Sequence, residues 1–168
     1  MQVHKEAKTL EALNHPNITK FVRVYKDRAE NFNMVMEYVD GGTLADLIEE
    51  HRNAGTLMSE DEIFNYFTQI CLAIKHCHDR KLLHRDIKDE NIFITSRKII
   101  KLGDFGVSKI LKGTRDKALT VIGTPENMSP ELLQSKPYNQ KSDIWQLGML
   151  LFKMCTLSLP WSCESIED

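Results

Sequence analysis

Charged and amide side chains gather in two short segments of this 168-residue chain, HRDIKDEN at 84–91 and GDFG at 103–106. An aspartate such as Asp86 can accept the proton of a hydroxyl group and aim its oxygen, and Lys88 can neutralise an anion beside it. Asn91 and Asp104 supply the oxygen atoms that Mg²⁺ prefers as ligands. These residue types suit phosphoryl transfer, which needs an aimed nucleophile and neutralised phosphate charge.

A third motif, GTP…SPE, spans Gly123 to Glu131. A lone Asp-Phe-Gly occurs by chance in many proteins, so each motif taken singly can equally be a polar loop with solvated charges. The three motifs in this order and spacing are far more specific.

The elements that must position these motifs follow from hydrophobic spacing. We expect a helix from about Lys5 to Leu13, ended by Pro16, because proline cannot continue a helix. Two runs rich in β-branched and aromatic residues, ITKFVRVY at 18–25 and NMVMEYV at 33–39, predict strands. Thr43 can cap a short helix over 44–50.

Longer helices are predicted after these strands. Ser59 and Glu62 form a capping-box pattern ahead of a main core helix. Its predicted core face consists of the apolar residues spaced by three or four, namely Ile63, Phe64, Phe67, Ile70, Cys71 and Ile74. The segment 142–157, SDIWQLGMLLFKMCTL, is almost wholly apolar and predicts a buried helix. Strands that precede helices indicate an α+β fold.

Composition bounds the class of protein. A chain with 42% hydrophobic and 27% charged residues is expected to form one globular domain. The formal net charge of −2 gives no general attraction to nucleic acid or to an anionic membrane, and no apolar run is long enough for membrane insertion. The four cysteines show no CxxC pair, so we interpret them as reduced thiols, with Cys71 and Cys155 in the core. We expect a cytoplasmic protein, with a cytoskeletal or nuclear location as alternatives.

The motifs HRDIKDEN, DFG and GTP…SPE resemble those of the eukaryotic protein kinase superfamily over essentially the whole chain. The strings LNHPNI, NIFIT, KLGDFG, MSPE, SDIWQLG and CTLSLPW are most similar to the NIMA-related (Nek) kinases. The resemblance implies a two-lobe kinase fold, ATP and Mg²⁺ as cofactors, and proteins as substrates. It divides the chain into an N-lobe remnant at 1–36, a hinge at 37–42 and a partial C-lobe at 43–168.

The resemblance also assigns roles in catalysis. It implies that Asp86 orients the substrate hydroxyl and that Lys88 contacts the transferred phosphate. A lysine at the Lys88 position is typical of serine/threonine kinases. Asn91 and Asp104 match the magnesium ligands, and Asp143 matches the aspartate that anchors the backbone of the catalytic loop.

The segment MVMEYVDGG resembles the kinase hinge. Met36 would be the gatekeeper, the Glu37 carbonyl and the Val39 amide would hydrogen-bond the adenine edge, and Phe93 would form the apolar floor. Periodicity alone leaves open that this segment is only a buried strand. The resemblance further implies a stacked apolar spine that consists of Leu10, Phe21, His84 and Phe105.

Regulation is implied by five further positions. Glu6 matches the helix glutamate that pairs with a lysine of the third N-lobe strand. Thr120 matches an activating phosphosite whose phosphate would be held by Arg85 and Lys109, and Thr124 would contact Asp86 and Lys88. The alternative for Thr120 is an unmodified loop hydroxyl.

Several residues depart from the kinase pattern. Asp89 replaces a proline at a position that is expected to be structural. With Glu90 it forms an acidic pair, in which the resemblance implies that the glutamate binds a basic residue upstream of the phosphoacceptor; a solvated acidic pair is the alternative. Gln146 and Met149 depart from DIWSLGC without an expected chemical consequence, and Asn127 replaces an aromatic residue. His76 and His78 are predicted to be surface residues.

The 168 residues contain neither a Gly-rich loop nor a VAIK-like lysine, so the kinase domain is predicted to be truncated at both ends. We therefore expect the chain by itself to show no phosphotransfer. A non-catalytic, pseudokinase-like module that binds protein partners is the alternative function.

Overall fold

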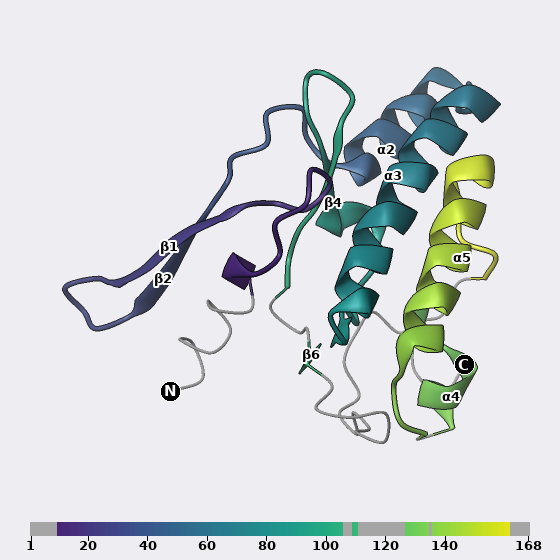
Figure 1. Cartoon of the computed structure of the whole chain (residues 1–168). Coiled ribbons are helices and arrows are strands. Elements are labelled where there is room, and N and C mark those ends of the chain that lie inside the picture. The colour runs from purple at the N-terminus through teal and green to yellow at the C-terminus, as the bar shows by residue number, and fades with distance from the viewer. Residues whose placement is uncertain (1–9, 106–108, 111–126, 135, 162–168) are drawn as a thin grey trace.

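A computed structural model describes residues 10–105, the backbone of 109–110, and residues 127–134 and 136–161 (Figure 1). Its strands are β1 Phe21–Lys26, β2 Phe32–Met36, β3 Leu82–Leu83, β4 Ile92–Ile94, β5 Ile100–Leu102 and β6 Lys109–Ile110. Its helices are α2 Leu44–Ala54, α3 Glu60–Asp79, the 3₁₀ turn η1 Asp89–Asn91, α4 Pro130–Leu133 and α5 Gln140–Thr156. The mixture of strands and helices confirms the predicted α+β class.

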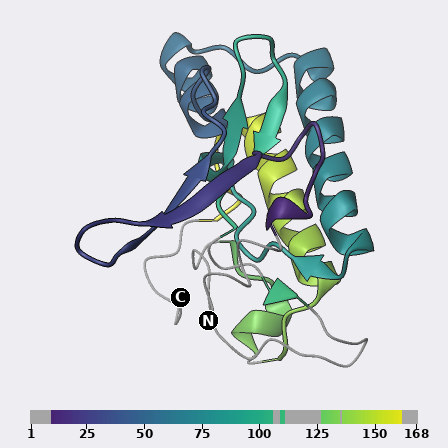
Figure 2. The ribbon, with the colours of Figure 1, turned by 60° about the vertical axis from the view of Figure 1, so that its left-hand side comes forward.

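The strands β1 and β2 form an antiparallel ribbon that projects away from the helices (Figures 1 and 2). Both predicted strands exist, although the first begins at Phe21 and the second ends at Met36. Ahead of the ribbon, Ile18 makes an isolated parallel bridge to Leu102 in β5. This bridge joins the ribbon to the body of the molecule, next to the β4–β5 pair.

The helix α2 begins with the predicted cap. The Thr43 hydroxyl accepts a hydrogen bond from the Asp46 N–H at 3.1 Å, and the Asp46 carboxylate accepts from the Thr43 N–H at 2.8 Å. The helix runs to Ala54, beyond the predicted end, and stops where Gly55 adopts a left-handed conformation at φ 65°.

The helix α3 is the predicted core helix, capped by Ser59, whose hydroxyl accepts from the Glu62 N–H at 3.3 Å. The predicted face was wrong at Phe64, which is 74% exposed, whereas Ile63, Phe67 and Cys71 pack against the core while partly buried. The fully buried residues of the helix are Tyr66, Ile70, Ala73, Ile74 and Cys77.

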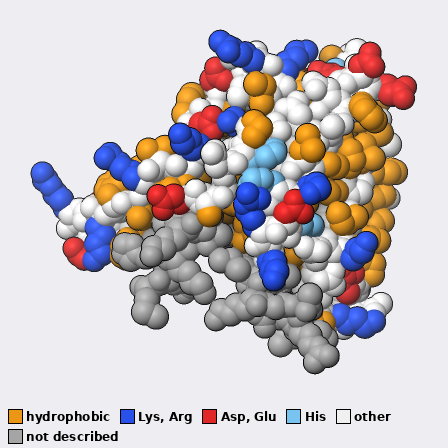
Figure 3. Space-filling view, in the orientation of Figure 1, with side chains coloured by type: hydrophobic (Ala, Val, Ile, Leu, Met, Phe, Trp, Pro, Cys, Tyr) orange, Lys and Arg blue, Asp and Glu red, His pale blue; other side chains and the backbone are white. Residues whose placement is uncertain are grey.

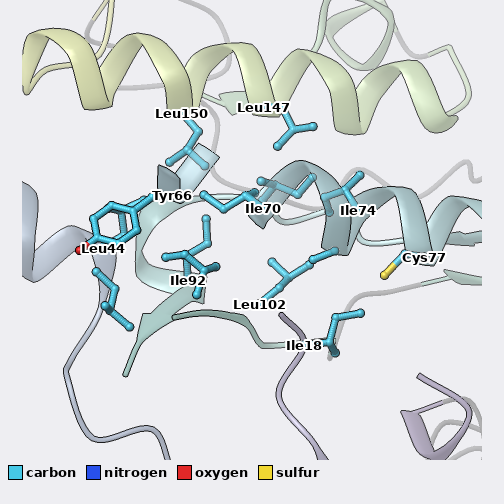
Figure 4. Close-up of a cluster of buried hydrophobic side chains, with 14 of the residues drawn as sticks. Ile18, Leu44, Tyr66, Ile70, Ile74, Cys77, Ile92, Leu102, Leu147 and Leu150 are labelled. Atoms are coloured by element: carbon cyan, nitrogen blue, oxygen red, sulfur yellow. The ribbon is translucent and has the colours of Figure 1, made fainter. Parts of the chain in front are cut away.

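The main core lies between α3, α5 and the β4–β5 pair (Figure 4). Leu147 and Leu150 of α5 lie over Ile70 and Ile74 of α3, and Ile92 lies beneath them. Truncating a fully buried side chain such as Ile70 costs about 2–5 kcal/mol in proteins generally. This core is the support on which the loops of the site rest.

The helix α5 is buried on one face only, so the prediction of a fully buried helix was wrong. Ile144 and Phe152 are 48% and 42% exposed, and hydrophobic side chains gather along that side of the molecule (Figure 3). Cys155 is exposed rather than in the core, whereas Cys77 is buried. At the α4 end of the helix, the rings of Trp145 and Trp161 have centroids 6.2 Å apart.

Within the part of the chain that the structure describes, no helix combines the length and apolar character that a bilayer span requires.

Candidate active site

The loop between β3 and η1, together with η1 itself, brings three of the predicted site residues together. The side-chain amide of Asn91 donates to the Asp86 carboxylate at 2.9 Å and to the Asp86 backbone carbonyl at 2.9 Å. The Lys88 ammonium lies 3.4 Å from the same carboxylate. All three side chains are buried or half-buried, so the charges of Asp86 and Lys88 are screened less than those of an exposed pair.

The backbone of this loop is anchored by Asp143, as predicted. Asp143 lies fully buried in the first turn of α5, and its carboxylate accepts from the N–H groups of His84 at 3.2 Å and Arg85 at 3.0 Å. Arg85 has φ 77°, a left-handed conformation that is unfavourable for a residue other than glycine. The hydrogen bonds from Asp143 therefore hold a conformation that the loop alone would avoid.

Two more side chains bind Asp143. His78 Nε2 lies 2.6 Å from one carboxylate oxygen, and the Tyr138 hydroxyl donates to the other at 2.5 Å. Burial acts to raise the pKa of Asp143, but the hydrogen bonds from His78, Tyr138 and the Arg85 N–H outweigh it, and the pKa lies below its ordinary value. Burial and the adjacent carboxylate raise the pKa of Tyr138, so its hydroxyl remains a donor.

These contacts correct two predictions. His78 was expected on the surface, yet its ring is largely buried against Asp143. Gln146 was expected to have no chemical role, yet it is buried and its carboxamide contacts the loop backbone. A signal was present in the sequence, since Asp143 and Gln146 are polar residues three apart on a helix that is otherwise largely apolar.

Asp104 is held beside Asn91 through the backbone of Gly103. The Gly103 N–H donates to the Asn91 carbonyl at 2.9 Å, and the Gly103 carbonyl lies 3.0 Å from His84 Nε2. Asp104 itself is exposed and has φ 51°. The fixed peptide at 103 places the Asp104 carboxylate and the Asn91 carboxamide on neighbouring strands of backbone at one end of β5.

Two members of the predicted spine are in direct contact, and the other two lie in or against the main core. The rings of His84 and Phe105 meet edge to face with centroids 4.9 Å apart. Leu10 and Phe105 are buried in the main core, and Phe21 packs against it. Since burial lowers the pKa of His84, the neutral imidazole is favoured within this stack.

A cavity of about 460 Å³ opens beside these residues, between the ribbon and the β4–β5 pair. Its lining includes every predicted adenine-contacting residue together with Asp104; these are Met36, Glu37, Val39 and Phe93. A side chain at position 103 would place its Cβ 2.5 Å from the Phe93 ring, so glycine is required there for the ring to form this wall. The walls are largely apolar, which suits a flat aromatic base.

The hinge residue Glu37 is fixed by its side chain and its backbone. Its carboxylate accepts from the Lys101 ammonium at 2.9 Å and the Lys20 N–H at 3.0 Å, while its own N–H donates to the Lys20 carbonyl at 2.8 Å. Burial acts to raise the pKa of Glu37, but these hydrogen bonds outweigh it and lower the pKa. The roles of the Glu37 carbonyl and the Val39 amide toward adenine stay predictions.

The structure describes only some of the predicted regulatory residues. Glu6, Thr120 and Thr124 lie outside the described residues, and Lys109 is described only by its backbone in β6. Arg85 is buried, with its guanidinium 5.8 Å from the centre of the Tyr138 ring, and burial lowers its pKa. The predicted phosphothreonine site stays a prediction.

The neighbouring acidic residues Asp89 and Glu90 lie in different environments, because Asp89 is buried and Glu90 is exposed. Asp89 is 3% exposed, and its carboxylate lies 2.6 Å from the Lys153 ammonium on α5. The alternative of a solvated acidic pair is therefore wrong for Asp89, because its carboxylate is paired inside the fold. Glu90 is exposed, and its contact with a basic substrate residue stays a prediction.

Asn91 and Asp104 could provide two ligands of a magnesium ion whose other ligands are water and substrate phosphates. The described residues hold no cluster of three or more His, Cys, Asp or Glu side chains that could bind a metal by themselves. Mg²⁺ is commonly bound by one or two carboxylates, with water and substrate phosphates as the other ligands. The Asp104 carboxylate in the cavity lining, with the Asn91 carboxamide on the adjacent backbone, matches that pattern.

The fold and the site define a protein kinase, and comparison with known proteins agrees. The protein kinase domain family matches residues 1–168, so the chain belongs to the protein kinase family. It is 47% identical to human serine/threonine-protein kinase Nek5 over 165 residues, 46% identical to mouse Nek1 over 164 residues, and 44% identical to mouse Nek3 over 165 residues. Each alignment covers 98% of this chain.

The chain spans only part of these relatives, namely 23% of Nek5, 13% of Nek1 and 32% of Nek3. The predicted resemblance to the Nek kinases and the serine/threonine class are confirmed.

Proposed function

We propose that this chain forms the nucleotide cleft and the catalytic loop of a kinase that transfers the γ-phosphate of ATP to serine or threonine hydroxyls of proteins. The observation that supports it best is the cluster of Asp86, Lys88 and Asn91, which lies where the backbone also fixes Asp104 at the mouth of the cavity. A binding module without chemistry has no need to bring these four side chains together.

Each residue has a role in this proposal. Asp86 accepts the proton of the attacking hydroxyl and aims its oxygen. Lys88, which shares the Asp86 carboxylate, contributes positive charge toward the transferred group. Asn91 and Asp104 hold Mg²⁺. When bound, ATP with Mg²⁺ supplies the phosphoryl group and spreads its negative charge.

The cavity orients the nucleotide in the same proposal. Phe93 forms the apolar floor under the adenine, Met36 is the gatekeeper, and the backbone of Glu37 and Val39 hydrogen-bonds the adenine edge. Asp143 keeps the loop backbone rigid through its bonds to His84 and Arg85. Preorganised groups of this kind usually provide a large part of an enzyme's rate enhancement.

The test uses a chimera in which a Gly-rich loop and a VAIK-like lysine segment from a Nek relative are joined ahead of residue 1. We expect Mg²⁺-dependent transfer of radiolabelled phosphate from ATP to a mixed Ser/Thr peptide, with phosphoserine and phosphothreonine as the products. Residues 1–168 alone are expected to show no transfer, because one missing charge-stabilising donor already costs roughly 3–4 kcal/mol of transition-state stabilisation.

The matched control is Asp104→Ala in the chimera, which removes the proposed magnesium ligand and leaves Met36, Glu37, Val39 and Phe93 unchanged. Labelling that persists in this variant would assign the chemistry to other residues. A folded chimera that binds ATP and shows no labelling would favour the non-catalytic binding module instead.

A further inference from the structure

Gln146 is a buried polar residue on a helix that otherwise buries mainly apolar side chains. It is 2% exposed, and its carboxamide makes three hydrogen bonds. The Oε1 atom accepts from the Ile87 N–H at 3.1 Å and from the Tyr138 hydroxyl at 3.0 Å, while Nε2 donates to the Arg85 carbonyl at 3.4 Å. Every polar atom of this side chain is therefore engaged.

The two backbone groups that Gln146 binds flank one residue. The Arg85 carbonyl belongs to the peptide unit that enters Asp86, and the Ile87 N–H belongs to the peptide unit that leaves it. Holding both peptide units fixes the backbone torsions on either side of the Asp86 Cα atom. Those torsions set the direction in which the Asp86 carboxylate points.

Asp143 does not perform this task. It lies one helical turn before Gln146, and its bonds go to the N–H groups of His84 and Arg85. These bonds fix the approach to the left-handed residue Arg85, whose φ is 77°. Further along the loop, the Arg85 carbonyl and the Ile87 N–H are the backbone groups that Gln146 binds.

A carboxamide suits this position for a chemical reason. It offers a donor and an acceptor on one planar group, whereas an ionised carboxylate offers only acceptors. It also carries no charge beside the Asp143 carboxylate, to which it is linked through the shared hydroxyl of Tyr138. A buried like charge there would be strongly unfavourable.

We propose that Gln146 is a positioning residue for the reaction, which sets the direction of Asp86 by holding both of its peptide units. The proposal rests on the proposed kinase function only in naming Asp86 as the catalytic residue. The geometric part stands on the hydrogen bonds alone, and it can be tested in the chain without any activity.

The test is amide hydrogen exchange in the 168-residue chain, parent against Gln146→Met, which keeps the size of the side chain and removes its hydrogen bonds. We expect exchange of the Ile87 amide to rise by about tenfold, the factor that corresponds to losing one hydrogen bond of ordinary net strength. The His84 and Arg85 amides, which Asp143 holds, are expected to change less. An Ile87 amide as protected as in the parent would overturn the proposal.

The matched control is Met154→Ala on the same helix, which removes buried apolar contacts. We expect it to raise exchange across α3 and α5 together. A Gln146→Met profile that shows this same uniform rise would mean a structural role only. Should Gln146→Met fail to fold, Gln146→Asn serves, because its shorter carboxamide cannot keep all three bonds, and a protected Ile87 there again overturns the proposal.

The effect of Gln146→Met on catalysis is measured in the chimera. Gln146→Met is expected to lower kcat by about tenfold or more with the KM for ATP unchanged, because the cavity wall is untouched. An unchanged kcat in a variant whose Ile87 amide has lost protection would also overturn the positioning role. A parent chimera without transfer would count against the proposed function and would leave the exchange result intact.

Discussion

The carboxylate of Asp86 is held from two directions. Lys88 and Asn91 reach its oxygen atoms, while side chains of α5 bind the backbone around it. None of these contacts involves the wall of the cavity where adenine is expected. Proton acceptance and nucleotide binding are therefore separable at the level of single residues.

The substitution Asp86→Asn tests this separation. We expect kcat of the chimera to fall by about 10²–10⁴-fold, the usual contribution of a positioned acid or base, while ATP affinity stays within about twofold. Steady-state kinetics gives the first quantity and calorimetric titration of ATP gives the second. Full turnover in the variant would remove Asp86 from the proposed role.

At the scale of elements, α5 binds the catalytic segment at several positions along its length. Asp143 and Gln146 bind the loop before η1, and Lys153, two turns further along the helix, pairs with Asp89 at the start of η1. The Asp89 carboxylate is nearly inaccessible, so this pair is shielded from solvent and salt on that side.

A double-mutant cycle measures the interaction energy of the Asp89–Lys153 pair. Asp89→Asn or Lys153→Met alone is expected to lower the free energy of unfolding by about 3 kcal/mol, because each leaves a shielded charge without its partner. The double variant should lose less than the sum, with a coupling of about 0.5–3 kcal/mol. Urea unfolding followed by circular dichroism provides the values.

The exposed pair Lys75–Asp79 on α3 serves as the control for this cycle, since its atoms are also 2.6 Å apart but lie in solvent. Its coupling is expected to be only about 0.3–0.5 kcal/mol. Equal couplings for the two pairs would show that the burial of Asp89 adds nothing.

The sequence predicted where helices and strands occur better than it predicted which of their side chains are buried. The caps at Thr43 and Ser59 are local, so the starts of α2 and α3 were predicted correctly. The buried face of α3 was not, because periodicity cannot choose between Phe64 and Tyr66 when apolar residues occur on several sides. That choice is made by α5 and β5, which are distant in the sequence and pack against α3.

At the scale of the whole molecule, the family motifs predicted the class and most of the site. Asp86, Asn91 and Phe93 lie as expected because the motif specifies both residue and surroundings. The misinterpreted residues, namely His78, Gln146 and Cys155, have partners or exposure that depend on tertiary contacts. His78 binds Asp143 of α5, which is 65 residues away, and Gln146 of α5 binds the backbone of Ile87, which is 59 residues away.

The stability of the whole molecule is expected to depend on histidine protonation. Burial lowers the pKa of His84, His76 and His15, and Arg80 adds to this for the last two. A histidine with a lowered pKa binds a proton more readily in the unfolded chain than in the folded one. Stability is therefore fully present above the ordinary histidine pKa of about 6.5 and declines as the pH falls below it, by up to about 1.4 kcal/mol per pH unit for each group.

Urea unfolding between pH 7.5 and pH 5 checks this prediction. His84→Gln is expected to make the decline shallower, whereas Met154→Ala lowers stability at every pH and keeps the slope. A parent protein whose stability rises on acidification through this range would contradict the sign of the effect.

The chain contains two tryptophans, and the close pair Trp145–Trp161 accounts for both. Intrinsic fluorescence therefore comes almost entirely from one corner of the molecule, where Trp161 is 44% exposed and α5 begins. An emission change during denaturation reports the loosening of that corner, and a nucleotide that enters the cleft meets no indole. Replacing Tyr38, which lines the cleft and is 89% exposed, with tryptophan would give the hinge an optical signal of its own.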